Sequence, residues 1–229
     1  MKWLKLNLWK IPLFIIGFSL FEVLLFRFLP PVITPHMLIR WVEGKVEHKP
    51  AGISVKWCRI EKVSPYLIQA IIASEDQRFF THNGFDWEQI DRQLNRFRRL
   101  KGLNKLSKLK GASTISMQTA RSTFLWQGRR GSTSSWIRKG LEAYYTILIE
   151  LLWPKKRILE VYLNVIEWGS GIYGAEAAAR KYFKCSAHGL TSQQAALMVA
   201  VLPNPRRWSP ASPSPYILKR QLEILQQTK

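Results

Sequence analysis

The sequence predicts a mainly α-helical protein with one membrane-spanning helix at its N-terminus. Apolar residues recur at spacings of three and four in many segments, and the strict alternation typical of strands is scarce. One run, from Ile11 to Leu29, is almost wholly apolar. The chain has 229 residues, 47% of them hydrophobic, which is enough for one domain with a core and a short appendage.

The apolar run has the length, about 20 residues, that a helix needs to cross a bilayer. Residues 1–10 contain three lysines and no acid, so they are expected to stay on the cytoplasmic side. Residues 11–30 are the expected span, residues 31–54 a connector, and residues 55–229 the globular domain. A cleaved signal peptide is an alternative, but the proline-rich stretch after Leu29 is unlike a cleavage site. The other alternative is that this run is a buried core helix.

The net charge of +20 and the pI of about 10.3 predict a polyanionic partner or an anionic surface. Nucleic acid is one such partner; an anionic membrane or a pyrophosphate-bearing substrate is the other. The 10 Trp and 11 Phe residues favour the membrane surface. The most basic stretch, from Arg92 to Lys110, is either a solvated loop or a mobile flap that contacts lipid headgroups. Two cysteines give no disulfide framework, and no zinc-site spacing occurs.

A helix predicted from Pro65 leads from apolar residues into two adjacent acids, Glu75 and Asp76. A carboxylate at the end of an apolar helix is a candidate general base. The turn signal Asn83-Gly84 folds the chain back and brings His82 near these acids. The alternative is that both acids lie on a solvated surface, the commoner meaning of such a pair.

Further helices are expected along the rest of the chain. One begins at Asp86, which is a plausible N-cap, and another follows the loop that contains Ser113 and Thr114, where backbone N–H groups can bind an anion. A long helix runs from Trp136 to about Trp153 and places Arg138 and Glu142 on one face. An ordinary exposed ion pair has the same spacing and is the commoner meaning of it. The remaining expected elements are a core helix ending at Asn164, a turn at Glu167 to Gly171, a small-residue helix from Gly174, a helix near Leu190 to Met198, a proline-fixed loop at Leu202 to Trp208 and a last helix from about Pro215.

Four motifs occur in one order: E-D-x-x-F-x-x-H-x-G from Glu75, G-x-S-T-x-x-x-Q from Gly111, R-K-x-x-E from Arg138, and K-x-x-I-L-E-x-Y-L-N ending at Asn164. Together they resemble the signatures of the peptidoglycan glycosyltransferases, in particular the monofunctional biosynthetic transglycosylases of Gram-negative bacteria. Two departures stand out. Met117 occupies a position that is usually Gln, and Arg121 stands where Lys is commoner, although it keeps the positive charge.

The resemblance implies a mainly α, lysozyme-like domain with two lobes around a groove. It implies polymerisation of lipid II with inversion at the anomeric carbon and release of undecaprenyl pyrophosphate. Glu75 and Glu142 would be the catalytic carboxylates, with Glu75 the general base. The resemblance places the following residues at the substrate, with Asp76 and His82 as supports: Asp76, Phe79, His82, Ser113, Thr114, Gln118, Arg121, Arg129, Arg138 and Lys139.

The resemblance also implies the setting of the enzyme. A divalent cation, Mg²⁺ or Mn²⁺, is a candidate cofactor with Glu142 as its candidate ligand, and no organic cofactor is expected. The expected partners are lipid II, the lipid-linked glycan chain, the membrane, and other cell-wall synthases or division proteins, without nucleic acid. The chain would be a single-pass protein of the bacterial inner membrane, with its N-terminus in the cytoplasm and its catalytic domain in the periplasm.

Two other functions are compatible with this sequence. A lysozyme-like hydrolase or lytic transglycosylase would also use a glutamate in a helical fold, but would have no need of clustered cations. A catalytically silent membrane anchor for the cell-wall machinery would tolerate replacement of Glu75. A nucleic-acid binder ranks third because of the membrane segment.

Overall fold

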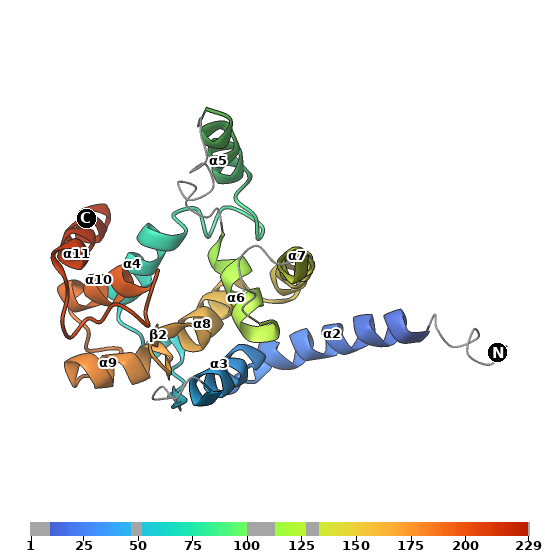
Figure 1. Cartoon of the computed structure of the whole chain (residues 1–229), viewed down its shortest axis with the longest axis horizontal. Helices are drawn as coiled ribbons and strands as arrows, with labels where there is room; N and C mark the ends of the chain where they lie inside the picture. The colour runs from blue at the N-terminus through green and yellow to red at the C-terminus, as the bar shows by residue number, and fades with distance from the viewer. Residues whose placement is uncertain (1–9, 47–51, 100–112, 127–132, 229) are drawn as a thin grey trace.

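A computed structural model of the chain describes residues 10–46, 52–99, 113–126 and 133–228 (Figure 1). The predicted mainly helical, lysozyme-like class is confirmed, because these residues form α-helices with few strands. The helices are α2 (Lys10–Phe28), α3 (Pro35–Val46), α4 (Pro65–Glu75), α5 (Trp87–Arg99), α6 (Ile115–Phe124), α7 (Thr133–Leu152), α8 (Lys155–Val165), α9 (Ala175–Phe183), α10 (Ser192–Val201) and α11 (Pro215–Gln227), with a short 3-10 helix, η1 (Ile60–Lys62).

A small sheet stands where the sequence predicted only a turn. Its strands are β1 (Ser54–Val55), β2 (Glu167–Gly169) and β3 (Ile172–Tyr173), in the order β1-β3-β2, with β3 parallel to β1 and antiparallel to β2. Of the turn predicted at Glu167 to Gly171, the first three residues form β2, and only Ser170 and Gly171 form the tip of the β2–β3 hairpin. Strands of two or three residues are too short to show an alternating pattern, which explains why the sequence did not reveal them.

Helix α8 lies at the centre of the domain. Ile158, Leu159 and Leu163 on it are almost completely buried, as the core-helix interpretation predicted. Helices α6 and α7 pack on one side of it, and α10 packs against α4 and α11 on the other (Figure 1). Burial of these apolar faces holds the two groups of helices on either side of α8.

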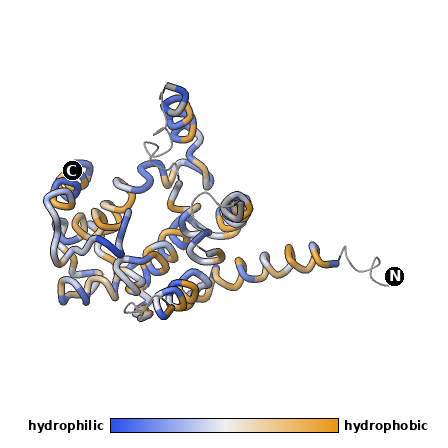
Figure 2. The backbone as a smooth tube through the Cα atoms, viewed as in Figure 1, coloured by the Kyte–Doolittle hydropathy of each residue, from blue (hydrophilic) through white to orange (hydrophobic). Residues whose placement is uncertain are grey.

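Helix α2 is long and apolar enough to cross a membrane, with 19 residues and a mean hydropathy of 2.0. Figure 2 shows hydrophobic residues along its length, and Figure 1 shows its N-terminal half extending beyond the other helices. Only Ser19 and Val23 of α2 are buried, so the core-helix alternative is not supported. The C-terminal half packs on α7: the Ser19 and Tyr144 hydroxyls are 2.7 Å apart, and Trp153 Nε1 donates to the Val23 carbonyl.

Helix α5 projects from the rest of the described chain (Figure 1). Its N-cap is Asp86, as predicted, because Asp86 Oδ1 accepts a hydrogen bond from Gln89 N at 2.9 Å. The first part of the basic stretch, residues 92–99, belongs to α5 and is therefore not the loop or flap that was predicted there. The rest of that stretch, from residue 100 to Lys110, and the predicted substrate residue Arg129 lie outside the described residues.

Candidate active site

A polar cleft of about 530 Å³ lies between the two groups of helices. This volume is within the range of small-molecule sites, roughly 300–1,000 Å³. Four of its lining residues were predicted from the sequence: Glu75, Gln118, Arg121 and Arg138. The others are His36, Arg40, Ser122, Tyr162, Ile166, Glu167, Leu202, Pro203, Asn204, Pro205 and Arg206.

Glu75 is the last residue of α4 and is half-buried at the cleft wall. The apolar face of α4, with Leu67 and Ile71 completely buried, fixes the position of this helix end. Gln118 Nε2 donates a hydrogen bond to Glu75 Oε2 at 3.0 Å. Burial, followed by the negative charge of Glu75, raises the pKa of the Tyr162 phenol well above its usual range, so that group stays protonated beside the carboxylate.

Behind Glu75, a buried network joins the first motif to the second. Asp76 accepts hydrogen bonds from His82 Nε2 at 3.0 Å and from the backbone N–H of Ile115 at 2.9 Å. His82 Nδ1 in turn accepts from the Gly84 N–H at 3.1 Å, which places the ring proton on Nε2. Asp76 thus satisfies a free N–H at the start of α6 and complements the helix dipole there. The predicted approach of His82 to the acids is confirmed.

Thr114 completes this link as the N-cap of α6. Its hydroxyl donates to the Gly84 carbonyl at 2.6 Å and accepts from Met117 N at 3.1 Å. The C-terminus of α4 is therefore fixed to the N-terminus of α6, which sets the distance between Glu75 and Gln118. The Met117 side chain is 6% exposed. It packs in the interior and does not line the cleft.

The remaining predicted residues of these motifs occupy different places. Phe79 is completely buried, with Lys155 Nζ 4.7 Å above the centre of its ring. Ser113 is half-buried at the entry to α6. Asp76, Phe79, His82 and Thr114 lie behind the cleft wall, where they support Glu75 and Gln118; direct contact of these residues with substrate stays a prediction.

Glu142 on α7 is 0% exposed and is surrounded by cations. Its Oε2 accepts from Arg138 Nη1 at 3.0 Å, and its Oε1 accepts from Lys139 Nζ at 2.5 Å. Arg121 Nη1 lies 4.0 Å from Oε2. Since Arg121 and Arg138 line the cleft, the buried carboxylate holds two guanidinium groups at the cleft wall.

This arrangement does not fit a divalent cation resident at Glu142. Both carboxylate oxygens already accept from a cationic side chain. Within the described ranges, no group of three His, Cys, Asp or Glu residues is placed to bind a metal ion. We therefore assign no step of the chemistry to a metal.

The cleft also contains residues outside the four motifs: His36 and Arg40 of α3, Glu167 of β2 and Arg206. Burial, reinforced by Arg40, Arg121 and Arg206, lowers the pKa of His36 to about 4, so its ring is neutral at physiological pH. Burial raises the pKa of Glu167, and the Gly171 N–H, Arg206 and Arg40 partly offset this increase. The sequence signals for these residues were the turn predicted from Glu167 and the proline-fixed loop that contains Arg206; neither indicated a binding role.

Comparisons with known proteins agree on one family. The Transglycosylase family model matches residues 44–229. The chain is 48% identical to the biosynthetic peptidoglycan transglycosylase of Bdellovibrio bacteriovorus over 229 residues, which cover 98% of this chain and 86% of that protein. It is 46% identical to the protein of the same description from Chromohalobacter salexigens over 93% of this chain and 87% of that one. It is 45% identical to the protein of the same description from Caulobacter vibrioides, over 88% of this chain and 81% of that one.

Proposed function

We propose that this chain, which belongs to the Transglycosylase family, polymerises lipid II into glycan strands. The chain is a glycosyltransferase of peptidoglycan synthesis. The proposal adds the substrate, inversion at the anomeric carbon and release of undecaprenyl pyrophosphate. The observation that carries it is a half-buried carboxylate, Glu75, in the same cleft as guanidinium groups held on the buried Glu142.

Glu75 is the general base in this proposal. A sugar hydroxyl is a poor nucleophile until a base removes its proton. Glu75 takes the proton from the 4-hydroxyl of lipid II, and the hydroxyl oxygen forms a bond to the anomeric carbon of the growing chain. Attack from the face opposite the leaving group inverts that carbon. The Gln118 hydrogen bond to Oε2 orients the carboxylate for this transfer.

The leaving group is a lipid pyrophosphate, which departs with the electron pair of the broken C–O bond. Stabilising it requires positive charge more than a proton. Arg121 and Arg138 supply this charge in the cleft, and Lys139 lies beside them with its side chain 43% exposed. Guanidinium groups bind phosphate oxygens through two parallel N–H donors. Glu142 keeps these groups in place before the substrate arrives, which lowers the reorganisation needed in the transition state.

The N-terminal helix suits a substrate whose lipid tail stays in a membrane. We infer that α2 spans the bacterial inner membrane, with the lysine-rich residues before it in the cytoplasm and the catalytic domain in the periplasm. The exposed side chains of α2 support this inference, because Phe14 is 71% and Phe21 59% exposed. The hydrogen bond of Ser19 with Tyr144 of α7, and that of the Val23 carbonyl with Trp153 just after α7, connect α2 to the domain that contains the cleft.

The test is polymerisation of labelled lipid II by the full chain in detergent, with products separated on a gel. Glu75→Gln is compared with Glu223→Gln, which removes an exposed carboxylate of α11 that does not line the cleft. We expect glycan ladders from the parent and the control, and a loss of about a hundredfold or more in rate from a folded Glu75→Gln protein. Shortening of added glycan would instead indicate a hydrolase. Failure of the parent beside an active polymerase would refute the proposed reaction.

A further inference from the structure

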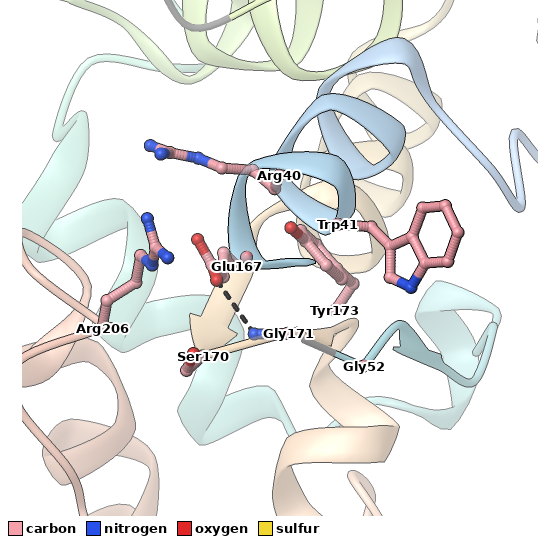
Figure 3. A pocket seen from close by; sticks show the side chains of 9 residues that line it. Arg40, Trp41, Gly52, Glu167, Ser170, Gly171, Tyr173 and Arg206 are labelled. Carbon is pink, nitrogen blue, oxygen red and sulfur yellow. Dashed lines mark hydrogen bonds between the residues drawn. The ribbon is translucent and has the colours of Figure 1, made fainter. Parts of the chain in front are cut away.

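One end of the cleft, beside a small cavity, holds three charged side chains from three separate segments. Arg40 comes from α3, Glu167 from β2, and Arg206 from the loop after α10. In Figure 3 the two arginines reach toward Glu167 from different elements, and the same three residues line a small cavity beside the cleft. The cavity of about 20 Å³ is also lined by Tyr173 and Gly171. Its volume suffices for one water molecule, which needs about 10–15 Å³.

Two buried donors at this cavity have no protein partner in the described part of the chain. Tyr173 is 1% exposed, and its hydroxyl makes no hydrogen bond to a described residue. The buried Nε of Arg40 likewise has no hydrogen-bond partner among the described residues. Buried polar groups are nearly always hydrogen-bonded, so an unpaired buried hydroxyl at a cavity points to a bound water or ligand atom. In Figure 3 the Tyr173 side chain lies between Arg40 and Gly171.

The charges at this end do not neutralise one another directly. In the described ranges no ion pair joins Glu167 to either arginine; Arg40 Nη1 pairs instead with Glu43 at 2.8 Å. Glu167 Oε1 accepts from the Gly171 N–H at 3.0 Å, which leaves Oε2 to accept from a ligand. A group that combines a carboxylate with an N–H donor would satisfy both signs of charge.

The position of this cluster indicates which part of the substrate it meets. Arg138 belongs to α7, the helix on which α2 packs. In the proposed function the lipid pyrophosphate lies at Arg121 and Arg138, so the rest of the headgroup occupies the remainder of the same cleft, which Arg40, Glu167 and Arg206 also line. Arg206 belongs to the segment that joins α10 to α11, and Figure 1 shows these two helices on the side of the molecule away from α7.

We propose that Arg40, Glu167 and Arg206 form a subsite for the peptide of the substrate headgroup. The arginines bind a peptide carboxylate, and Glu167 accepts a neighbouring amide N–H. A water in the small cavity links Tyr173 and Arg40 to this assembly. The subsite rests on the proposed function, since it assigns a further part of the same lipid-linked substrate to the same cleft.

The test compares lipid II with an analogue whose peptide carboxylates are converted to amides. Steady-state kcat and KM are measured for the parent, Arg206→Gln and Arg207→Gln. Arg207 is the matched control, an exposed neighbour that lines neither cavity. We expect the parent to favour the carboxylate substrate by about tenfold in kcat/KM, mostly through KM, and Arg206→Gln to lose that preference. Arg207→Gln should keep it.

Binding separates failure of this subsite from failure of the proposed reaction. Anisotropy of fluorescent lipid II and its amide analogue is measured with Glu75→Gln, alone and combined with Arg206→Gln. An Arg206-dependent preference without polymerisation by the parent would leave the subsite standing and refute the polymerase. Polymerisation or binding with equal preference in the Arg206 and Arg207 variants would overturn the subsite.

Discussion

Replacement of Gly84 by alanine tests the link between the first two motifs. Gly84 has a φ of +89°, where an L side chain costs about 1 kcal/mol or more. A Cβ there would lie 2.8 Å from Thr146 Cγ2 and 3.1 Å from Glu150 Cγ. Neither neighbour moves freely: the Thr146 hydroxyl donates to the Glu142 carbonyl at 2.6 Å, and Glu150 accepts from Lys155 Nζ at 2.8 Å. Overpacking of this kind costs about 1–3 kcal/mol.

The sum is a loss of about 3 kcal/mol for Gly84→Ala, which lowers the thermal midpoint by roughly 6–12 °C for a domain of this size. Tryptophan fluorescence of the protein in detergent measures the midpoint. We also expect slower polymerisation, because the Gly84 carbonyl that accepts from Thr114 would be displaced.

The control is Gly140→Ala on α7. A Cβ there meets no described atom within 4 Å, so alanine should raise stability by about 0.5–1 kcal/mol through its helix preference. An unchanged midpoint and rate for Gly84→Ala would refute the proposed coupling of the two motifs.

Two other perturbations probe the charges of the cleft. Glu142→Gln leaves Arg138 and Lys139 without their buried counter-charge. We expect a loss of about 3 kcal/mol in stability, measured by thermal unfolding, and a large fall in kcat, measured by lipid II turnover. Equal kcat in the variant and the parent would contradict the role given to Glu142. His36 has a folded pKa of about 4 against 6.5 when unfolded, so the unfolded chain binds more protons between these values and stability falls as pH drops below about 6.5. The expected loss from His36 is about 2 kcal/mol at about pH 5, and His36→Gln should lack this part of the pH dependence of the midpoint; identical pH profiles would refute it.

The predicted elements with strong local signals were confirmed in the structure. The helix ending at Glu75, the Asp86 cap and the inward face of α8 depend on residues close together in sequence, whose spacing fixes which side is apolar. The prediction of a simple turn at Glu167 was wrong, because this segment forms a β-hairpin. Its pairing with β1 joins residues more than a hundred positions apart, and such contacts leave no local pattern.

The roles within the motifs needed the tertiary structure. The motif resemblance gave Asp76 and His82 a supporting role and grouped Phe79 with the substrate residues; all three are buried and none of them lines the cleft. Spacing alone could not distinguish an exposed ion pair at Arg138 and Glu142 from a buried one. The difference arises because Arg121, from another helix, closes over the same carboxylate.

The sequence by itself determined the helical class, the apolar N-terminal segment and the identity of the motif residues, because these follow from local periodicity and residue chemistry. Only the tertiary structure decided that Glu75 meets Gln118, that Glu142 is enclosed by cations, and that Arg40, Glu167 and Arg206 share one end of the cleft. These groupings result from packing of segments distant in the chain. Such packing is governed by the shape of the whole core, which no local pattern contains.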